Sequence, residues 1–220
     1  MNGDGGIDAL IARSATKEKL FYSALRLFAR KGYANVGIRE LCRSVGIKES
    51  SFYNHYPGKE SLFGAIIAYF GETCDRAVMN EDGIRAFIEA GDVRAFFTED
   101  MKRFAEATAD PPFHTALKIV LTEAYLHPAA AEMAKNNLYH LRKGYTERVL
   151  RGMMDSGAIR RCDAETVTAE YYYALKGMLD EYLLLLVWNG DLTPINARIA
   201  AHIDFFTRML QPADDERNDA

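Results

Sequence analysis

The sequence predicts an all-α protein with about nine helices. Apolar side chains recur at helical spacing along most of the chain, and no segment shows the alternation of a half-buried strand. Glycine, Asn-Gly and proline breaks separate the apolar stripes, as helix ends and starts do. With 220 residues, 49% of them hydrophobic, the chain is long enough to bury a sizeable core.

The first three predicted helices are short and closely spaced. The first covers residues 17–31 and ends at Gly32, since glycine suits the left-handed position just past a helix. The second covers 38–45 and is closed by Gly46 in the same way. The third, over 49–56, has a length of roughly 12 Å.

Longer helices are expected to follow. One begins near Gly58, and residues 81–91 are expected to be a looser region. Caps and apolar stripes then predict helices over residues 97–104, 111–127, 138–155, 163–188 and 193–211. We expect four parts: a DNA-binding domain over 14–60, a connecting helix over 58–76, a helical body over 77–211 and a disordered acidic tail over 212–220.

Charge is distributed unevenly along the chain. The net charge is −4, but residues 1–60 carry 10 basic against 6 acidic side chains, and the remainder carries 17 against 25. A cationic module on an acidic body is the distribution expected when only one end of a protein meets phosphates.

Two short helices around a glycine turn have the lengths and spacing of a helix-turn-helix, in which the second helix enters the major groove of DNA. Ile38, Leu41, Val45, Ile47 and Phe52 are spaced to pack these helices onto the first. The polar residues between Lys48 and His55 are then left facing outward.

Residues 17–70 resemble the DNA-binding domain of TetR/AcrR-family transcriptional regulators. The segments that carry the resemblance are LFxxxGY from Leu27, IRELCRSVGI from Ile38 and SFYNHYPGKESL from Ser51. The resemblance implies phosphate contacts from Tyr53, His55 and Lys59, and base or groove contacts from Arg39, Lys48, Glu49, Ser50, Ser51 and Asn54. Two positions depart from the family pattern, since Gly37 replaces a Ser or Thr cap and Glu49 a small or basic residue.

Each DNA contact has a plainer interpretation. Tyr53 also suits packing, because tyrosine buries its ring readily. His55 could instead interact only with the C-terminal end of its own helix. Lys48 and Lys59 could be ordinary solvated charges. The Glu49 carboxylate could accept a hydrogen bond from a cytosine amino group. Alternatively, it could repel phosphates and so lower non-specific affinity for DNA.

The body is expected to bind a small molecule and a second subunit. The resemblance implies an apolar or aromatic effector in a middle layer, with plain core as the alternative. Its candidate lining residues are Phe97, Met101, Phe104, Phe113, His114, Leu117, Leu121, Tyr125, Tyr139, Tyr145, Met178 and Tyr182. The last two helices carry a second apolar face, which favours a homodimer, with a single intramolecular bundle as the alternative. The candidate interface residues are Leu175, Leu179, Leu183, Leu186, Ile199 and Phe206.

Other classes of function have little support in the sequence. Three scattered cysteines and five scattered histidines give no metal or cofactor motif, and no catalytic motif is recognisable. No apolar run approaches the length of a membrane span, so we expect a cytoplasmic protein. The leading hypothesis is a homodimeric repressor that binds a palindromic site in double-stranded DNA. The alternatives are a helical enzyme with an unrecognised site and a helix-turn-helix scaffold that binds protein.

Overall fold

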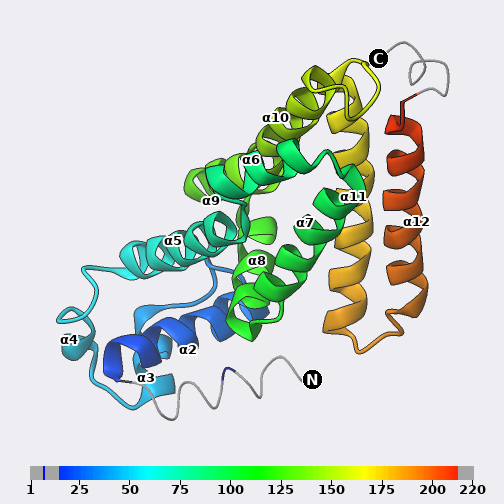
Figure 1. The fold of residues 1–220 in the computed structure, drawn as a ribbon. Helices are drawn as coiled ribbons and strands as arrows, with labels where there is room; N and C mark the ends of the chain where they lie inside the picture. Colours follow the sequence, from blue (N-terminus) through cyan, green and yellow to red (C-terminus); the bar gives the residue numbers. More distant parts are fainter. Residues whose placement is uncertain (1–6, 8–14, 213–220) are drawn as a thin grey trace. The chain divides into compact units, whose positions relative to one another are not determined.

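The computed structural model describes Ile7 and residues 15–212, and all regular structure in these residues is helical. The all-α prediction is therefore confirmed (Figure 1). The helices are α2 (Thr16–Lys31), α3 (Ile38–Val45), α4 (Glu49–Phe52), α5 (Lys59–Ala77), α6 (Glu81–Ala90), α7 (Val93–Thr108), α8 (Pro111–Glu123), α9 (Pro128–Met133), a π-helical segment η1 (Ala134–His140), α10 (Leu141–Asp155), α11 (Ala164–Val187) and α12 (Thr193–Leu210). Of the predicted tail over 212–220, residues 213–220 lie outside the described residues.

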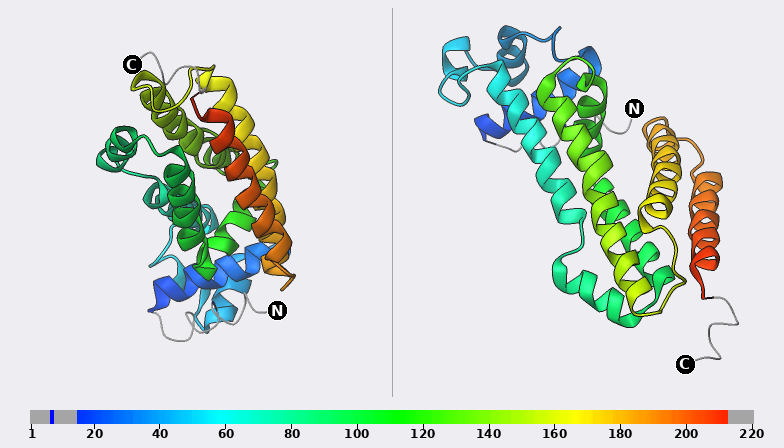
Figure 2. Two further views of the ribbon diagram at one scale, coloured as in Figure 1. Left: turned by 45° about the vertical axis from the view of Figure 1, so that its right-hand side comes forward. Right: turned by 90° about the horizontal axis from the view of Figure 1, so that it is seen from above.

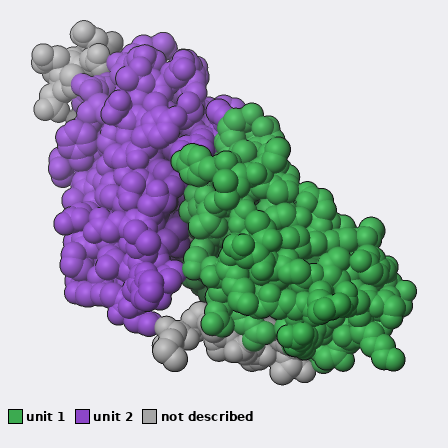
Figure 3. Space-filling view, turned by 180° about the vertical axis from the view of Figure 1, so that it is seen from behind, with its two compact units in different colours: residues 1–77, 106–138 green, residues 78–105, 139–220 purple. Residues whose placement is uncertain are grey.

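The chain divides into two compact units, which Figure 3 colours separately. Unit 1 comprises Met1–Ala77 and Glu106–Leu138, and unit 2 comprises Val78–Ala105 and Tyr139–Ala220. Helices α8 and α9, which sequence analysis assigned to the body, thus belong to the same unit as the predicted DNA-binding domain.

Unit 1 is organised around α2. This helix packs against α3, α5 and α8, and α4 follows α3 in contact with it. The side chains at the centre share complete or nearly complete burial: Leu20, Leu25, Phe28, Leu41, Phe52, Leu62 and Phe63. Removal of so much apolar surface from water is the main force that holds these short helices in place.

The third helix is shorter than predicted. The sequence pattern predicts a helix that runs to Tyr56, but α4 ends at Phe52 and the chain continues as a turn. The amides of His55 and Tyr56 both donate to the carbonyl of Phe52, at 2.9 and 3.0 Å. Pro57 disfavours helical geometry at Tyr56, the residue before it, so the helix does not continue into α5.

The segment expected to be loose is instead the regular helix α6. Asn80 caps it by accepting a hydrogen bond from the amide of Gly83 at 2.9 Å. Gly91 ends it in the left-handed conformation, and Ile84 is buried. The sequence contains both signals, an asparagine N-cap and a closing glycine, so this prediction was wrong although local evidence was present.

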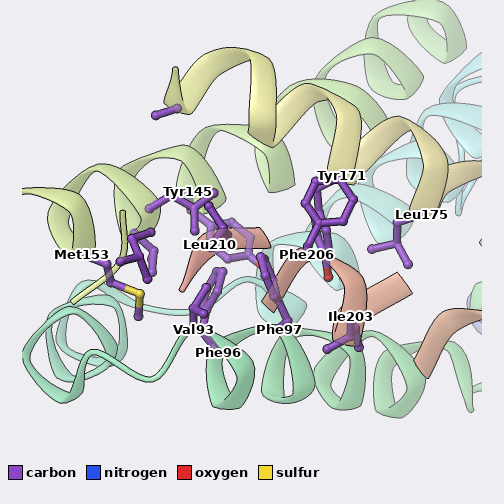
Figure 4. Close-up of a cluster of buried hydrophobic side chains, with 14 of the residues drawn as sticks. Val93, Phe96, Phe97, Tyr145, Met153, Tyr171, Leu175, Ile203, Phe206 and Leu210 are labelled. Carbon is purple, nitrogen blue, oxygen red and sulfur yellow. The ribbon is translucent and has the colours of Figure 1, made fainter. Parts of the chain in front are cut away.

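Unit 2 contains α6, most of α7, α10, α11 and α12 around a second hydrophobic core. Helix α10 packs against α6 and α11, and α11 and α12 lie side by side in each view (Figures 1 and 2). Figure 4 shows the aromatic part of this core, with Phe96, Phe97, Tyr171 and Phe206. No described helix has the length and apolarity that crossing a bilayer requires.

The turn between α3 and α4 gives a test of the fold. Gly46 has φ 73°, and a Cβ there would meet no atom within 4 Å. Gly46→Ala should therefore lower the free energy of unfolding by about 1–2 kcal/mol, through backbone conformation alone. Gly64→Ala is the matched control, because Gly64 lies exposed within α5 with open space around it.

The control should raise the unfolding free energy by about 0.5–1 kcal/mol, because alanine reduces the entropy of the unfolded chain. Urea denaturation measures both changes. Equal effects of the two substitutions would contradict the left-handed turn at Gly46.

Candidate nucleic-acid interface

The segment from Lys48 to His55 presents polar side chains to solvent because two of its aromatic neighbours are buried. Phe52 is fully buried and Tyr56 is 5% exposed, with their ring centroids 6.1 Å apart. The preceding turn is closed by the amide of Ile47, which donates to the carbonyl of Cys42 at 3.0 Å. Burial of one face of so short a segment leaves the other face free to meet a large partner.

The candidate DNA-contact residues differ in exposure. Arg39, Lys48, Glu49, Ser50, Tyr53 and Asn54 are exposed, whereas Ser51, His55 and Lys59 are half-buried. The Tyr53 ring packs edge-on against Phe52 at 5.6 Å, yet the side chain remains 57% exposed. Tyr53 therefore combines packing with an accessible hydroxyl.

Glu49, one of the two departures from the family pattern, pairs with Arg39. Its Oε1 atom accepts from Arg39 Nε at 2.8 Å, and this hydrogen bond raises the pKa of Arg39. The contact joins the first turn of α3 to the first turn of α4. Both side chains are well exposed, so the pair is only weakly favourable and opens readily.

Lys59 makes intramolecular contacts as well. Its Nζ atom donates to the carbonyl of Tyr33 at 2.9 Å and lies 4.1 Å from the centroid of the Tyr33 ring. An ammonium group has three donors, so these contacts leave capacity for a phosphate. The phosphate contact itself stays a prediction.

Tyr33 is a structural centre that sequence reasoning did not identify. Its hydroxyl donates to Glu60 Oε2 at 2.6 Å, and its backbone amide donates to Glu123 Oε1 at 2.7 Å. Burial, followed by the hydrogen bond to Glu60, raises the pKa of Tyr33, and the same hydrogen bond lowers the pKa of Glu60. His127 Nε2 approaches the other Glu60 oxygen at 3.0 Å.

One sequence signal points to this contact. Glu123 is 6% exposed and stands in α8, whose other buried residues are mostly apolar. A carboxylate on the buried side of a helix requires a donor, because burial of an unpaired charge is costly. The pattern predicts that a donor exists, but not that it lies 90 residues earlier.

The candidate effector residues occur in both units. Phe113, His114, Leu117, Leu121 and Tyr125 lie in unit 1, and Phe97, Met101, Phe104, Tyr139, Tyr145, Met178 and Tyr182 lie in unit 2. Phe113 stacks on Phe70 at 5.4 Å, within the core of unit 1. Tyr125 requires a correction: it is 95% exposed, because it follows the end of α8, and so it lines no enclosed site in this chain.

The candidate dimer residues require a larger correction. Leu175, Leu179, Ile199 and Phe206 are at most 8% exposed within a single chain, where they belong to the core of unit 2. Leu183 and Leu186 are half-buried. The exposed large apolar side chains of α11, α12 and the loop between them are instead Tyr173, Leu184, Val187, Trp188 and Phe205.

The comparisons with known proteins agree with the geometry of unit 1. Residues 20–66 match the family "Bacterial regulatory proteins, tetR family". The chain is 34% identical over 65 residues to YuxN of Bacillus subtilis, an uncharacterised HTH-type transcriptional regulator. The matched segment covers 29% of this chain and 22% of YuxN. It is also 38% identical over 47 residues to IcaR of Staphylococcus epidermidis, the negative regulator of a biofilm operon. This matched segment covers 21% of this chain and 25% of IcaR.

A solved structure extends the likeness to the whole fold. FadR of Bacillus halodurans superimposes with a TM-score of 0.58 at 18% identity, covering 89% of this chain and 96% of FadR. The likeness to FadR concerns the all-helical fold, and the family match concerns the helix-turn-helix segment. Over residues 20–66 the chain is therefore similar to the TetR family of bacterial regulatory proteins, and its overall fold is similar to that of FadR.

The contact between Tyr33 and Glu123 can be tested by stability. Glu123→Ala leaves the Tyr33 amide without its acceptor and should lower the free energy of unfolding by about 1–3 kcal/mol. Amide hydrogen exchange at Tyr33 should become faster. Glu72→Ala on the exposed side of α5 is the matched control and should change stability by less than about 0.5 kcal/mol. Unchanged exchange at the Tyr33 amide in Glu123→Ala would contradict the contact.

Proposed function

We propose that the protein is a homodimeric, sequence-specific DNA-binding repressor that a small apolar or aromatic effector releases from its operator. The observation that carries the proposal is the exposed polar segment from Lys48 to Asn54, supported from behind by buried Phe52. A short helix after a glycine turn suits the major groove, whose width is about 12 Å. IcaR, a negative regulator that matches in this region, supports the sign of regulation.

The proposed contacts divide into two kinds. Tyr53, His55 and Lys59 contact phosphates, which position the protein without reading sequence. Arg39, Lys48, Glu49, Ser50, Ser51 and Asn54 face the bases or the groove walls. The weak pair between Arg39 and Glu49 opens when a phosphate or base competes for the guanidinium group.

The dimer is proposed to form through the exposed apolar face of α11 and α12. Tyr173 and Leu184 are roughly three helical turns apart, so they lie on the same face of α11. On α12, Phe205 is exposed together with the small residues Ala197 and Ala201, which permit close approach of another helix. A two-fold dimer presents two recognition segments, and this arrangement matches a palindromic operator.

Effector control is proposed to act as a population shift. The effector binds more tightly to the arrangement that cannot bind DNA, and linkage then requires DNA to weaken effector binding by the same factor. FadR of Bacillus halodurans, a regulator of fatty acid degradation, is a structural neighbour, and its role in metabolism supports a metabolic effector for this protein.

Substitutions in the recognition segment should separate the two kinds of contact. Tyr53→Phe removes one phosphate donor and should weaken binding to all DNA duplexes alike. Asn54→Ala should change the preferred sequence, because one base contact contributes about 1–3 kcal/mol of discrimination. Fluorescence anisotropy against a set of duplexes at fixed salt measures both effects. Wild-type affinity and preference in both variants would contradict these contacts, and salt-independent binding would favour a protein partner.

The proposed dimer surface can be tested by charge insertion. Leu184→Glu places a charge in the apolar face and should convert dimers into monomers, because an unpaired charge is costly to bury. Tyr125→Glu is the matched control, since it alters an exposed apolar residue in unit 1 and should leave the dimer intact. Sedimentation at micromolar concentration distinguishes the two states. A monomeric unmutated chain would overturn the proposal.

A further inference from the structure

The core of unit 2 encloses a charged pair that DNA binding does not use. Asp100 on α7 is 4% exposed and accepts a hydrogen bond from Arg142 Nη2 on α10. The Arg142 guanidinium lies 4.9 Å from the centroid of the Phe104 ring. Burial acts to lower the pKa of Arg142, but the Asp100 carboxylate raises it overall, so Arg142 keeps its positive charge. A buried ion pair is weak evidence of a stabilising role, since apolar residues often replace one without loss.

Tyr171 on α11 holds a buried hydroxyl, and its ring packs against α7 at Phe97, about one turn before Asp100. The residue is 1% exposed, and its hydroxyl has no hydrogen-bond partner among the described residues. Its ring stacks on Phe97 at 4.1 Å and on His202 at 4.8 Å (Figure 4 labels the first of these contacts). His202 Nε2 lies 2.9 Å from the backbone carbonyl of Tyr171. His202 therefore contacts both the ring and the backbone of Tyr171.

The hydroxyl of Tyr171 lies within the electrostatic influence of both charges. Burial raises its pKa, Asp100 raises it further and Arg142 opposes the rise, so the group stays a neutral phenol. Because the stacked ring is fixed, the hydroxyl cannot turn away to find a partner. A buried polar group without a partner is costly and suggests that a partner is missing.

Two further observations concern the same region of the chain. Thr168, one turn earlier on α11, is fully buried, and its hydroxyl also lacks a hydrogen-bond partner within the described part of the chain. The π-helical segment η1 ends at His140, two residues before Arg142. Segments of π-helix are rare and occur frequently at functional sites.

We propose that Asp100, Arg142 and Tyr171 form the polar end of an effector site in unit 2, and that this site binds an uncharged phenol. The inference rests on the proposed function, because it names the chemical class of the effector and the residues that recognise it.

Charge decides the class of ligand. A ligand carboxylate that approached Arg142 would lie beside the carboxylate of Asp100, and a ligand ammonium would lie beside the guanidinium of Arg142. Either contact places like charges together in a medium of low polarity. A phenolic hydroxyl avoids both, since it donates to Asp100 and accepts from the hydroxyl of Tyr171.

The apolar part of the ligand has pliable neighbours. Met101 follows Asp100 on α7, and Met178 on α11 is also half-buried against the same core. Methionine side chains are unbranched and adapt to irregular shapes, so their displacement admits an aromatic ring at low cost. Phe104 supplies an aromatic face next to Arg142.

Three matched probes test the proposal on the full chain by calorimetry: 2-naphthol, its methyl ether 2-methoxynaphthalene and the anion 2-naphthoate. We expect 2-naphthol to bind, and we expect the ether and the anion to bind at least about tenfold more weakly. The loss of one hydrogen bond to a charged group reduces affinity by about that factor. Absence of 2-naphthol binding at millimolar concentration, or equal binding of all three probes, would overturn the proposal.

Two variants locate the bound probe. Tyr171→Phe keeps the stacked ring and removes only the unpartnered hydroxyl, so its denaturation midpoint should be unchanged or higher while its affinity for 2-naphthol falls about tenfold. Tyr56→Phe, which removes a phenolic hydroxyl from a nearly buried side chain in unit 1, is the matched control and should retain the affinity. Equal binding to wild type and Tyr171→Phe would place the ligand elsewhere, for example at the buried Nε2 atom of His114 in unit 1, and would overturn the site.

A DNA-binding measurement with and without 2-naphthol separates this inference from the proposed function. Weaker DNA binding in its presence, absent in Tyr171→Phe, supports both. A probe that binds through Tyr171 without any change in DNA affinity supports the site and contradicts effector-controlled release. DNA binding that no probe alters, combined with no probe binding, contradicts the site and leaves DNA recognition standing.

Discussion

The arrangement of unit 1 depends on one partly buried hydrogen bond, in which the backbone amide of Tyr33 donates to the carboxylate of Glu123. The amide follows directly on Gly32, whose φ of 79° turns the chain away from the end of α2. The carboxylate comes from the last residue of α8. Loss of this bond would leave a polar group buried without a partner on one or both sides.

Tyr33 extends this constraint to the start of α5 by using each of its polar groups. Its carbonyl accepts from Lys59 and its hydroxyl donates to Glu60, so both residues that open α5 are tied to the end of α2. The recognition segment lies between α3 and α5 in the chain, and its two ends are thereby fixed. A displacement of α8 would be transmitted to this segment through Glu123 and Tyr33, which gives the proposed switch a physical route within unit 1.

Local sequence patterns predicted most of the helices and the polar face of the recognition segment, because spacing and capping depend on near neighbours. They overestimated α4, since the apolar spacing through Tyr56 outweighed the effect of Pro57. The pairing of Tyr33 with Glu123 joins residues 90 positions apart, and no local pattern specifies such a partner. On α11, leucines occupy more than one face, so composition alone did not distinguish Leu179 in the core from Leu184 on the surface. The polar cluster of Asp100, Arg142 and Tyr171 was not predicted, because its members come from three helices and no local pattern joins them.

The central claim is that unit 1 reads a specific DNA sequence as part of a two-fold dimer. Selection of bound duplexes from a random-sequence pool by the full chain tests it most directly. The account predicts enrichment of one sequence with two-fold symmetry, whose half-sites are centred about one helical turn, roughly 34–36 Å, or a multiple of it apart. Retention of all duplexes in proportion to their abundance in the pool would contradict it.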